Sequence, residues 1–226
     1  MIIVHYLNNS RAQRILFLLE EMGLDYETNI FKRVGGLAPE AMKKVHPLGK
    51  APVITDGEHT IAESGAIVEY LAEKYGKESM VVDGDPDDPA VLNYRYWLHY
   101  SEGSLAPLLV MRIIFDRIEN AKVPFFIKPV SKGIVSQVMK SYLGPNLKNQ
   151  FDFVEEYLSN NQFFGGERFN SADIMMLFPL EGAMSRPEFA EKYPNIRDYV
   201  TRMQARPAYQ RALEAGTPYA FAKTSS

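Results

Sequence analysis

An acidic, proline-rich segment divides the chain into two stretches that follow different structural patterns. Residues 83–89 read Asp-Gly-Asp-Pro-Asp-Asp-Pro and show no hydrophobic periodicity, which is typical of a linker. Before this segment, short apolar runs alternate with helical periodicity, whereas beyond it every apolar pattern repeats at helical spacing. The sequence therefore predicts two domains, a mixed α/β domain over 1–82 and an all-helical domain over 90–226.

The first domain is expected to form one small mixed sheet with helices packed on it. Apolar runs and turn residues predict strands near residues 2–6, 26–31, 51–55 and 59–62. A helix between the first two strands is expected to begin at Ser10, with Gln13 reaching back to complete a capping box. A short helix within 39–45 and a longer one from Ser64 to Gly76 complete the predicted domain.

The second domain is expected to contain helices and no strands. Helical spacing predicts segments over 90–119, 130–141, 146–159, 194–204 and 207–215, with a kink at Pro107 in the first. A further helix should begin at Asn170, because Asn170 is a favoured N-cap and Asp173 places an acid in the first turn.

Composition excludes several classes of protein. The chain has no cysteine, so it offers no thiol nucleophile of its own, and any sulfur chemistry must come from a ligand. A net charge of -3 and a pI near 5.9 do not favour nucleic acid. No apolar run approaches the ~20 residues that a membrane-spanning helix needs. The four histidines lack the spacing of metal ligands, so no metal is expected: His5, His46, His59 and His99.

Two predicted strand-to-helix turns carry groups that suit an anionic ligand. The turn over residues 8–11 places Ser10 beside the free N–H groups of a helix start, and Ser64 occupies the same position in a later turn. Glu63 could pair with an ammonium group. Each serine could equally serve as a helix cap, and that alternative stays open for each turn taken alone.

The segment 46–53, His-Pro-Leu-Gly-Lys-Ala-Pro-Val, leads into the third predicted strand. A proline at the start of a strand lacks its own N–H donor, and a cis bond before Pro52 would expose the Val53 backbone to an incoming peptide. Because about 5–6% of X–Pro bonds are cis, spacing alone does not establish one. Lys50 could bind a carboxylate or lie free in solvent. Together the two turns and this segment supply what a γ-glutamyl peptide requires: donors for its two carboxylates, an acidic side chain for its amine and a free backbone edge.

Three ordered motifs make the chain resemble the cytosolic glutathione S-transferase family. They are Ser-Arg-Ala-Gln-Arg-Ile-Leu-Phe-Leu-Leu-Glu-Glu (10–21), His-Pro-Leu-Gly-Lys-Ala-Pro-Val-Ile (46–54) and Ala-Glu-Ser-Gly-Ala-Ile-Val-Glu-Tyr-Leu (62–71). The chain is most similar to the soluble fungal and bacterial enzymes called Gtt-type, and the similarity continues through 96–104 and 169–174. The resemblance implies a thioredoxin-like N-terminal domain, a helical-bundle C-terminal domain and a cytoplasmic homodimer that uses glutathione as co-substrate.

The resemblance also implies roles for individual residues. Pro52 would be cis, and Val53 would pair its backbone with the cysteinyl part of glutathione. Glu63 and Ser64 would hold the γ-glutamyl end, and Lys50 would meet the glycyl carboxylate. Asn170 and Asp173 match a structural motif of the helical domain.

The implied reaction is attack of the glutathione thiolate on a hydrophobic electrophile or a peroxide. Three residues could hold the thiolate, and Ser10 is preferred to Asn9 and Tyr6 because backbone N–H groups at the helix start reinforce its hydroxyl. A second hypothesis is a non-catalytic binding or interaction module of the same fold.

The electrophile should bind between the domains, where pockets often form. Four residues could line that pocket or belong to the core: Tyr94, Tyr100, Ser104 and Phe115. The apolar run over 108–111 favours a homodimer, because a small monomer would leave part of it uncovered.

Overall fold

The computed structural model describes residues 1–222, and its N-terminal part is built on a four-stranded sheet in the order β2-β1-β3-β4. Strand β1 (Ile2–Leu7) runs parallel to β2 (Tyr26–Phe31) and antiparallel to β3 (Val53–Asp56), which pairs with β4 (His59–Ala62). The parallel pair needs a crossover helix, and the two-residue turn after Asp56 joins an antiparallel hairpin, as the sequence predicts. The predicted mixed sheet is confirmed.

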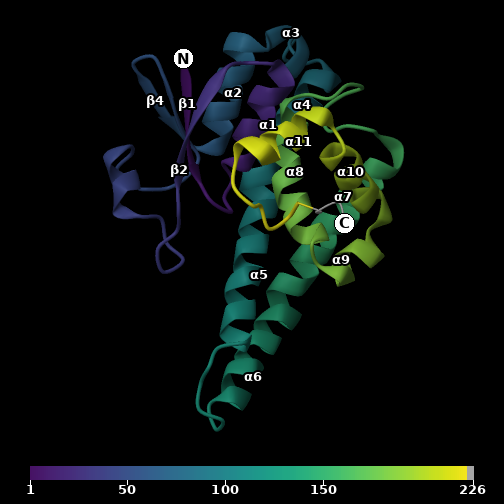
Figure 1. The fold of residues 1–226 in the computed structure, drawn as a ribbon. Helices are drawn as coiled ribbons and strands as arrows, with labels where there is room; N and C mark the ends of the chain where they lie inside the picture. The colour runs from purple at the N-terminus through teal and green to yellow at the C-terminus, as the bar shows by residue number, and fades with distance from the viewer. Residues whose placement is uncertain (223–226) are drawn as a thin grey trace.

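Helix α1 (Gln13–Met22) lies between the sheet and the helical domain, as Figure 1 shows. Residues Ile15 to Leu19 are at most 1% exposed, so both faces of this helix are covered. Helices α8 and α11 pack against α1 from the C-terminal half, and one continuous apolar core spans the two halves. The N-terminal half also contains η1 (Glu40–Lys44), α2 (Ser64–Tyr75) and α3 (Lys77–Met80).

The predicted capping box at the start of α1 is wrong. The helix begins at Gln13, its N-cap position is Ala12, and no side chain caps it. The Gln13 side chain accepts a hydrogen bond of 2.9 Å from the buried Tyr6 hydroxyl, so it is not available to reach back to residue 10. The Ser10 hydroxyl still accepts the Ala12 N–H at 3.2 Å, which closes a local turn ahead of the helix.

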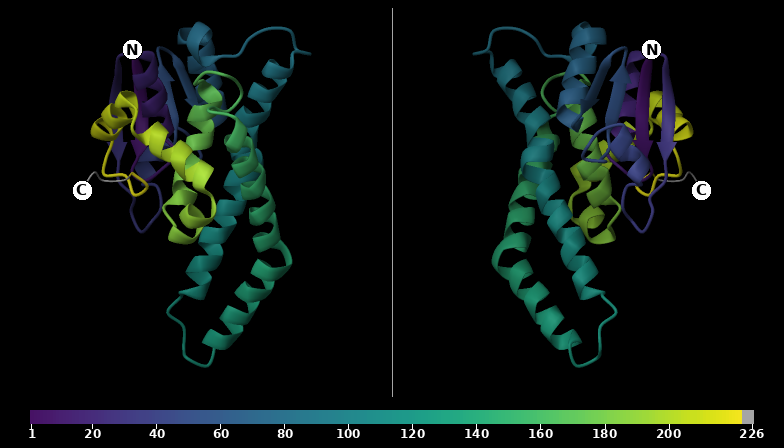
Figure 2. Two further views of the ribbon diagram at one scale, coloured as in Figure 1. Left: turned by 90° about the vertical axis from the view of Figure 1, so that its right-hand side faces the viewer. Right: turned by 90° about the vertical axis from the view of Figure 1, so that its left-hand side faces the viewer.

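The C-terminal half consists of two long interrupted helices and a set of shorter ones. In chain order they are α4 (Pro89–Tyr100), η2 (Ser101–Leu105), α5 (Ala106–Glu119), α6 (Lys128–Val138), η3 (Met139–Leu143), α7 (Gly144–Asn160), α8 (Ser171–Met184), α9 (Pro187–Lys192), α10 (Pro194–Gln204) and α11 (Pro207–Ala215). Helices α5 and α6 extend beyond the rest of the molecule as a long antiparallel arm (Figures 1 and 2).

Two wide π-helical turns, η2 and η3, each join two helices into one continuous helix, and the sequence predicted this continuity only for η2. Residues 90–119 form the single interrupted helix that was predicted, but the two helices expected over 130–141 and 146–159 are continuous through η3. Each wide turn ends two residues before a proline, Pro107 or Pro145. Proline cannot donate the regular helical hydrogen bond and its ring crowds the preceding turn, and a wide turn relieves both problems without ending the helix.

The predicted cap of α8 is confirmed. The Asn170 side chain accepts the Ala172 N–H at 2.9 Å, and the Asp173 carboxylate accepts the Asn170 N–H at 3.0 Å. Asp173 also accepts from the Phe164 N–H and the Tyr199 hydroxyl, so this buried box ties three segments of the helical domain together.

Residues 81–88 between α3 and α4 carry no helix or strand, which suits a linker. We keep 1–82, 83–89 and 90–226 as proposed domain limits, of which 223–226 lie outside the described residues. Throughout the described chain no helix is both long and apolar enough to cross a membrane.

Candidate functional site

A cleft of about 220 Å³ opens beside the sheet, where three loops meet the helical domain. The loop before β3 contributes Lys50, and the link from β4 to α2 contributes Glu63 and Ser64. Arg11 and Glu102 form the wall on the side of the helical domain. The fold therefore brings together three of the residues that were predicted to bind a peptide ligand. We call this the first cleft.

The link from β4 to α2 has two features that suit a ligand. Ser64 is 3% exposed, and within the described chain its hydroxyl has no hydrogen-bond partner. A buried hydroxyl without a partner is costly, so a ligand atom at the start of α2 would stabilise it. Glu63 has φ of 75°, which is unusual for a residue other than glycine and is typical of functional sites.

The loop before β3 follows the predicted course. The Ala51–Pro52 peptide bond is cis, as the family resemblance implies. Ala51 and Pro52 line the first cleft, and Lys50 is exposed beside them. The Val53 side chain is fully buried and is not part of the lining, so only the backbone of Val53 is a candidate for contact with a ligand.

The turn over residues 8–11 carries Arg11, which lines the first cleft, whereas Ser10 itself belongs to the lining of neither the first cleft nor the second pocket described below. Ser10 is 6% exposed, and its oxygen accepts the Ala12 N–H. In the part of the chain described by the structure, no hydrogen bond uses the Ser10 O–H as a donor. The hydroxyl proton is therefore available for an acceptor atom of a ligand.

The other two thiolate candidates are placed differently. Tyr6 is fully buried, its hydroxyl donates to Gln13, and it contributes to the lining of neither the first cleft nor the second pocket described below. Burial raises the pKa of this tyrosine above its ordinary value. Asn9 is exposed, and its side-chain oxygen accepts the Ala220 N–H at 3.0 Å, which leaves its amide N–H groups as donors.

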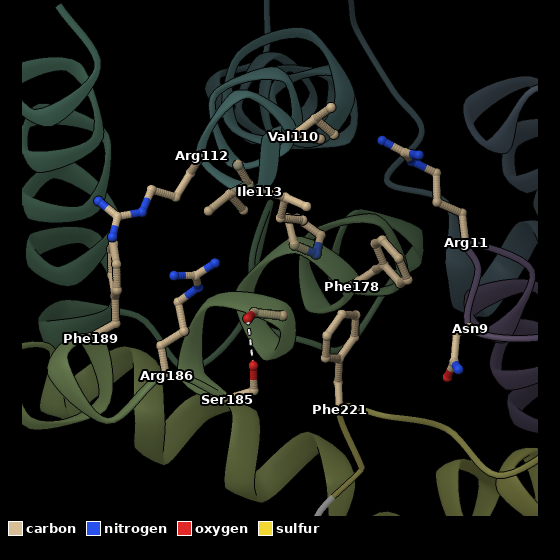
Figure 3. A pocket seen from close by; sticks show the side chains of 14 residues that line it. Asn9, Arg11, Val110, Arg112, Ile113, Phe178, Ser185, Arg186, Phe189 and Phe221 are labelled. Atoms are coloured by element: carbon tan, nitrogen blue, oxygen red, sulfur yellow. Dashed lines mark hydrogen bonds between the residues drawn. The ribbon is translucent and has the colours of Figure 1, made fainter. Parts of the chain in front are cut away.

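A second pocket, of about 280 Å³, lies between the turn before α1 and the helical domain (Figure 3). Asn9 and Arg11 form one end, and helices α5, α8 and α9 with the C-terminal segment form the rest. Arg11 lines both this pocket and the first cleft, so the two cavities meet at one guanidinium group. We call this the second pocket.

The wall residues expected from the sequence do not line the second pocket. Tyr94 and Tyr100 are buried in the core, where the Tyr94 hydroxyl forms a hydrogen bond with Ser171 and the Tyr100 hydroxyl donates to Gln150. Ser104 is exposed, and Phe115 packs against the core. For the two tyrosines, the alternative of a core position is the correct one. The aromatic walls are instead Phe178, Phe189 and Phe221.

Comparison with known sequences identifies the family. Residues 1–73 match the profile described as "Glutathione S-transferase, N-terminal domain", and residues 117–207 match "Glutathione S-transferase, C-terminal domain". Glutathione S-transferase 3 of Schizosaccharomyces pombe is 35% identical over 214 residues, covering 95% of this chain and 87% of that protein. The chain belongs to the glutathione S-transferase family.

Two further relatives of this transferase agree in sequence and in fold. Glutathione S-transferase 1 of Saccharomyces cerevisiae is 34% identical over 220 residues, which cover 93% of each chain. The crystal structure of a glutathione S-transferase from Actinobacillus pleuropneumoniae superposes with a TM-score of 0.76 at 32% identity, covering 95% of this chain and 92% of that one. The predicted family, fold, transferase function and glutathione co-substrate are thereby confirmed, and a non-catalytic module is not favoured.

The sequence motifs of this transferase did not predict a role for Arg11 and its partners. The Arg11 Nε lies 3.0 Å from both oxygens of Glu102, and the buried Arg14 donates to the same carboxylate at 2.6 Å. Burial opposes ionisation of Glu102, but the two guanidinium groups outweigh it and hold the pKa of Glu102 below its ordinary value. The sequence does contain a signal for this cluster, namely two arginines three residues apart beside a predicted anion site.

The C-terminal segment of the transferase also belongs to the site. The Ala220 N–H binds Asn9, Phe221 lines the second pocket, and the Tyr219 hydroxyl donates to the buried Glu181 at 2.5 Å. The last described residues thus connect the turn before α1 to helix α8. Residues 219–222 of this segment, Tyr-Ala-Phe-Ala, show no hydrophobic periodicity, so their contact with the site could not be predicted from the sequence.

Proposed function

We propose that this transferase binds glutathione in the first cleft and activates the thiol with the Ser10 hydroxyl. Ser64 and the start of α2 receive the γ-glutamyl carboxylate, Glu63 receives the ammonium group, and Lys50 receives the glycyl carboxylate. The Val53 backbone pairs with the cysteinyl residue. The observation that carries this proposal is the buried Ser64 hydroxyl, which has no hydrogen-bond partner among residues 1–222 and lies at the edge of a cleft that Lys50 and Glu63 also line.

The electrostatics of the turn before α1 support a thiolate at that position. A thiol with pKa ~8.5 must lose ~2 units to be mostly ionised at neutral pH, which requires ~2.7 kcal/mol of preferential thiolate binding. Ser10 can donate one charge-assisted hydrogen bond, and within residues 1–222 the two terminal nitrogens of Arg11 have no hydrogen-bond partner. Tyr6 and Asn9 rank lower, since the Tyr6 hydroxyl already donates to Gln13 and the Asn9 side-chain oxygen is held by the C-terminal segment. Within the described chain the Ser10 O–H donates to no group.

The electrophile is proposed to occupy the second pocket. Arg11 lies where the two cavities meet, so a sulfur atom beside it would face the second pocket directly. The sulfur forms a new bond to the electrophilic carbon as the leaving group departs with its electron pair. A peroxide is the alternative acceptor. The thiolate then bonds to one peroxide oxygen as the O–O bond breaks, an alcohol leaves, and the sulfur becomes a sulfenic acid. Because the chain has no cysteine, a second glutathione thiol displaces water from that sulfenic acid to give glutathione disulfide.

Replacing Ser64 by alanine is expected to weaken glutathione binding about tenfold, because a hydrogen bond to a charged group is lost. Isothermal calorimetry with millimolar glutathione measures the effect. Ser104→Ala is the matched control, since Ser104 is exposed and lines neither cavity. Equal affinities for all three proteins would contradict the proposed place of the γ-glutamyl end, and no binding by the unchanged protein would overturn the proposed site.

We also propose that the protein is a homodimer in the cytoplasm. The run over 108–111 supports the dimer less than expected, because Leu108 is buried and Val110 lines the second pocket. The stronger support is an apolar surface on α4 and α7, where Leu92, Tyr96 and Phe153 are 45–53% exposed.

Sedimentation at micromolar concentration is expected to give twice the 25.7 kDa mass of the chain. Phe153→Glu should shift the mass toward the monomer because it places a charge in the apolar surface, whereas Phe125→Glu on the arm should not. A monomeric mass for the unchanged protein would refute the dimer.

A further inference from the structure

The charged side chains that line the second pocket are all arginines. Among the described residues of the lining, Arg11 lies at one end, and Arg112 and Arg186 lie together at the other, as Figure 3 shows. The remaining lining is mostly apolar and aromatic: Leu109, Val110, Ile113, Phe178, Phe189 and Phe221. The pocket is therefore an apolar chamber with a positive group at each end.

The acids near these arginines do not neutralise them fully. Arg112 and Arg186 share Asp116, at 2.9 Å and 2.5 Å, and two guanidinium groups exceed one carboxylate by one charge. Glu188 lies 3.9 Å from Arg186 but is 60% exposed, so solvent weakens its contribution. At the opposite end, Arg11 and Arg14 share Glu102 and leave the same excess. Neither Asp116 nor Glu188 lines the pocket.

Arg112 and Arg186 retain donors that could bind an anion. Arg112 forms an ion pair with Asp116 through Nε, and one of its terminal nitrogens donates to the Met139 sulfur. Within the described chain the buried Nε–H and the other terminal nitrogen have no hydrogen-bond partner. The Nε of Arg186 is likewise without a partner among residues 1–222. Both side chains are only about a quarter exposed, at 26% and 28%, so an ion pair formed here is less screened than one on an open surface.

The two positive ends have different neighbours. Arg11 also lines the first cleft, so its end is the one next to the proposed sulfur position. Arg112 and Arg186 lie at the far end, beyond Phe178 and Phe221 and beside Phe189 (Figure 3). Resting on the proposed function, we infer that this transferase prefers electrophiles that carry an acidic group: an apolar body with the reactive carbon at one end and a carboxylate at the other, bound by Arg112 and Arg186.

A matched pair of substrates tests the inference: para-(chloromethyl)benzoate and its methyl ester. In both, the glutathione sulfur bonds to the benzylic carbon, chloride leaves with the electron pair, and the thiol proton passes to water. Each kcat/KM is divided by the spontaneous rate with glutathione, which removes differences in intrinsic reactivity. The carboxylate should be favoured about tenfold or more, the size of effect expected for one hydrogen-bonded ion pair.

Arg186→Gln is expected to remove most of that preference, because the rate with the carboxylate should fall about tenfold and the rate with the ester should fall much less. Asp116 keeps Arg112 as its ion-pair partner in this variant. Arg112→Gln provides a second variant with the same expected result. Arg117→Gln, on the exposed side of α5 and outside the lining, is the control and should keep the full preference.

Two results would overturn the inference. The first is turnover of both substrates with no preference for the carboxylate, and the second is an equal loss with both substrates in Arg186→Gln. Either leaves the proposed function intact, since glutathione would still be transferred. Failure of the unchanged protein to bind glutathione or to turn over either substrate would instead overturn the proposed function itself.

Discussion

Ser10→Ala is expected to lower the rate of glutathione transfer at neutral pH by about tenfold or more. The lost hydrogen bond to the thiolate is worth ~1.5–3 kcal/mol, which raises the pKa of bound glutathione by about one to two units. Part of the loss should return at higher pH, where the thiol ionises without help. The turn ahead of α1 should lose about 1 kcal/mol of stability as well, because the Ser10 oxygen accepts the Ala12 N–H.

The decisive measurement is the thiolate absorbance of the glutathione complex against pH. Ser10→Ala should titrate at a higher pH than the unchanged protein, whereas Asn9→Ala and Tyr6→Phe should titrate where it does. An unshifted titration in Ser10→Ala, together with a shifted one in either control, would move the role to that residue. Loss of the helix turn alone would lower the melting temperature and leave the titration where it was.

Glu181→Gln is expected to remove about 3 kcal/mol of pH dependence from the free energy of unfolding. Glu181 is fully buried in α8, where it accepts hydrogen bonds from Tyr209, Tyr219 and Gln204. Burial raises its pKa from 4.5 to about 7, although these hydrogen bonds oppose the shift. Because the folded state holds this proton more tightly, the contribution of Glu181 is fully present below pH 4.5 and is lost as the pH rises through 7.

Denaturant unfolding between pH 5 and pH 8 checks this result. The unchanged protein should lose stability over that range, and Glu181→Gln should lose less, because glutamine keeps its neutral state at every pH. Asp173 has a pKa raised to about 7 by burial, but it is present in both proteins and cancels in the comparison. Glu191→Gln, at an exposed position, is the control. Parallel pH curves for Glu181→Gln and the unchanged protein would contradict the assignment.

Local signals in the sequence predicted the succession of strands and helices along the first domain, the hairpin after Asp56 and the cap at Asn170, because each depends on residues close together in the chain. The box expected at Ser10 failed for the opposite reason. Its partner Gln13 is held by Tyr6, a residue of the preceding strand, and that contact depends on how α1 packs on β1. Hydrogen bonds from outside a motif cannot be read from its spacing.

The residues of the candidate site likewise fall into those that short motifs predicted and those that only the fold brings together. Lys50, Glu63 and Ser64 were predicted because they belong to short motifs, and the fold brings them to one cleft. The walls of the second pocket come from α5, α8, α9 and the C-terminal segment. Helical periodicity indicates that a side chain such as Tyr94 is buried, but not whether it faces the core or a cavity between helices. Arg112 and Arg186 are 74 positions apart in the chain, and both pair with Asp116 in the fold.

The contact of the C-terminal segment with the site has a practical consequence for preparing the protein. Phe221 forms a wall of the second pocket, and the Ala220 N–H donates to Asn9. A substitution or fusion close to Phe221 would therefore act on the cavity in which the electrophile is proposed to bind. Met1, by contrast, is 74% exposed and precedes β1 at the opposite end of the sheet from the turn that carries Asn9 (Figure 1). Kinetic comparisons of substrates are best made with a purification tag at the N-terminus or with the tag removed.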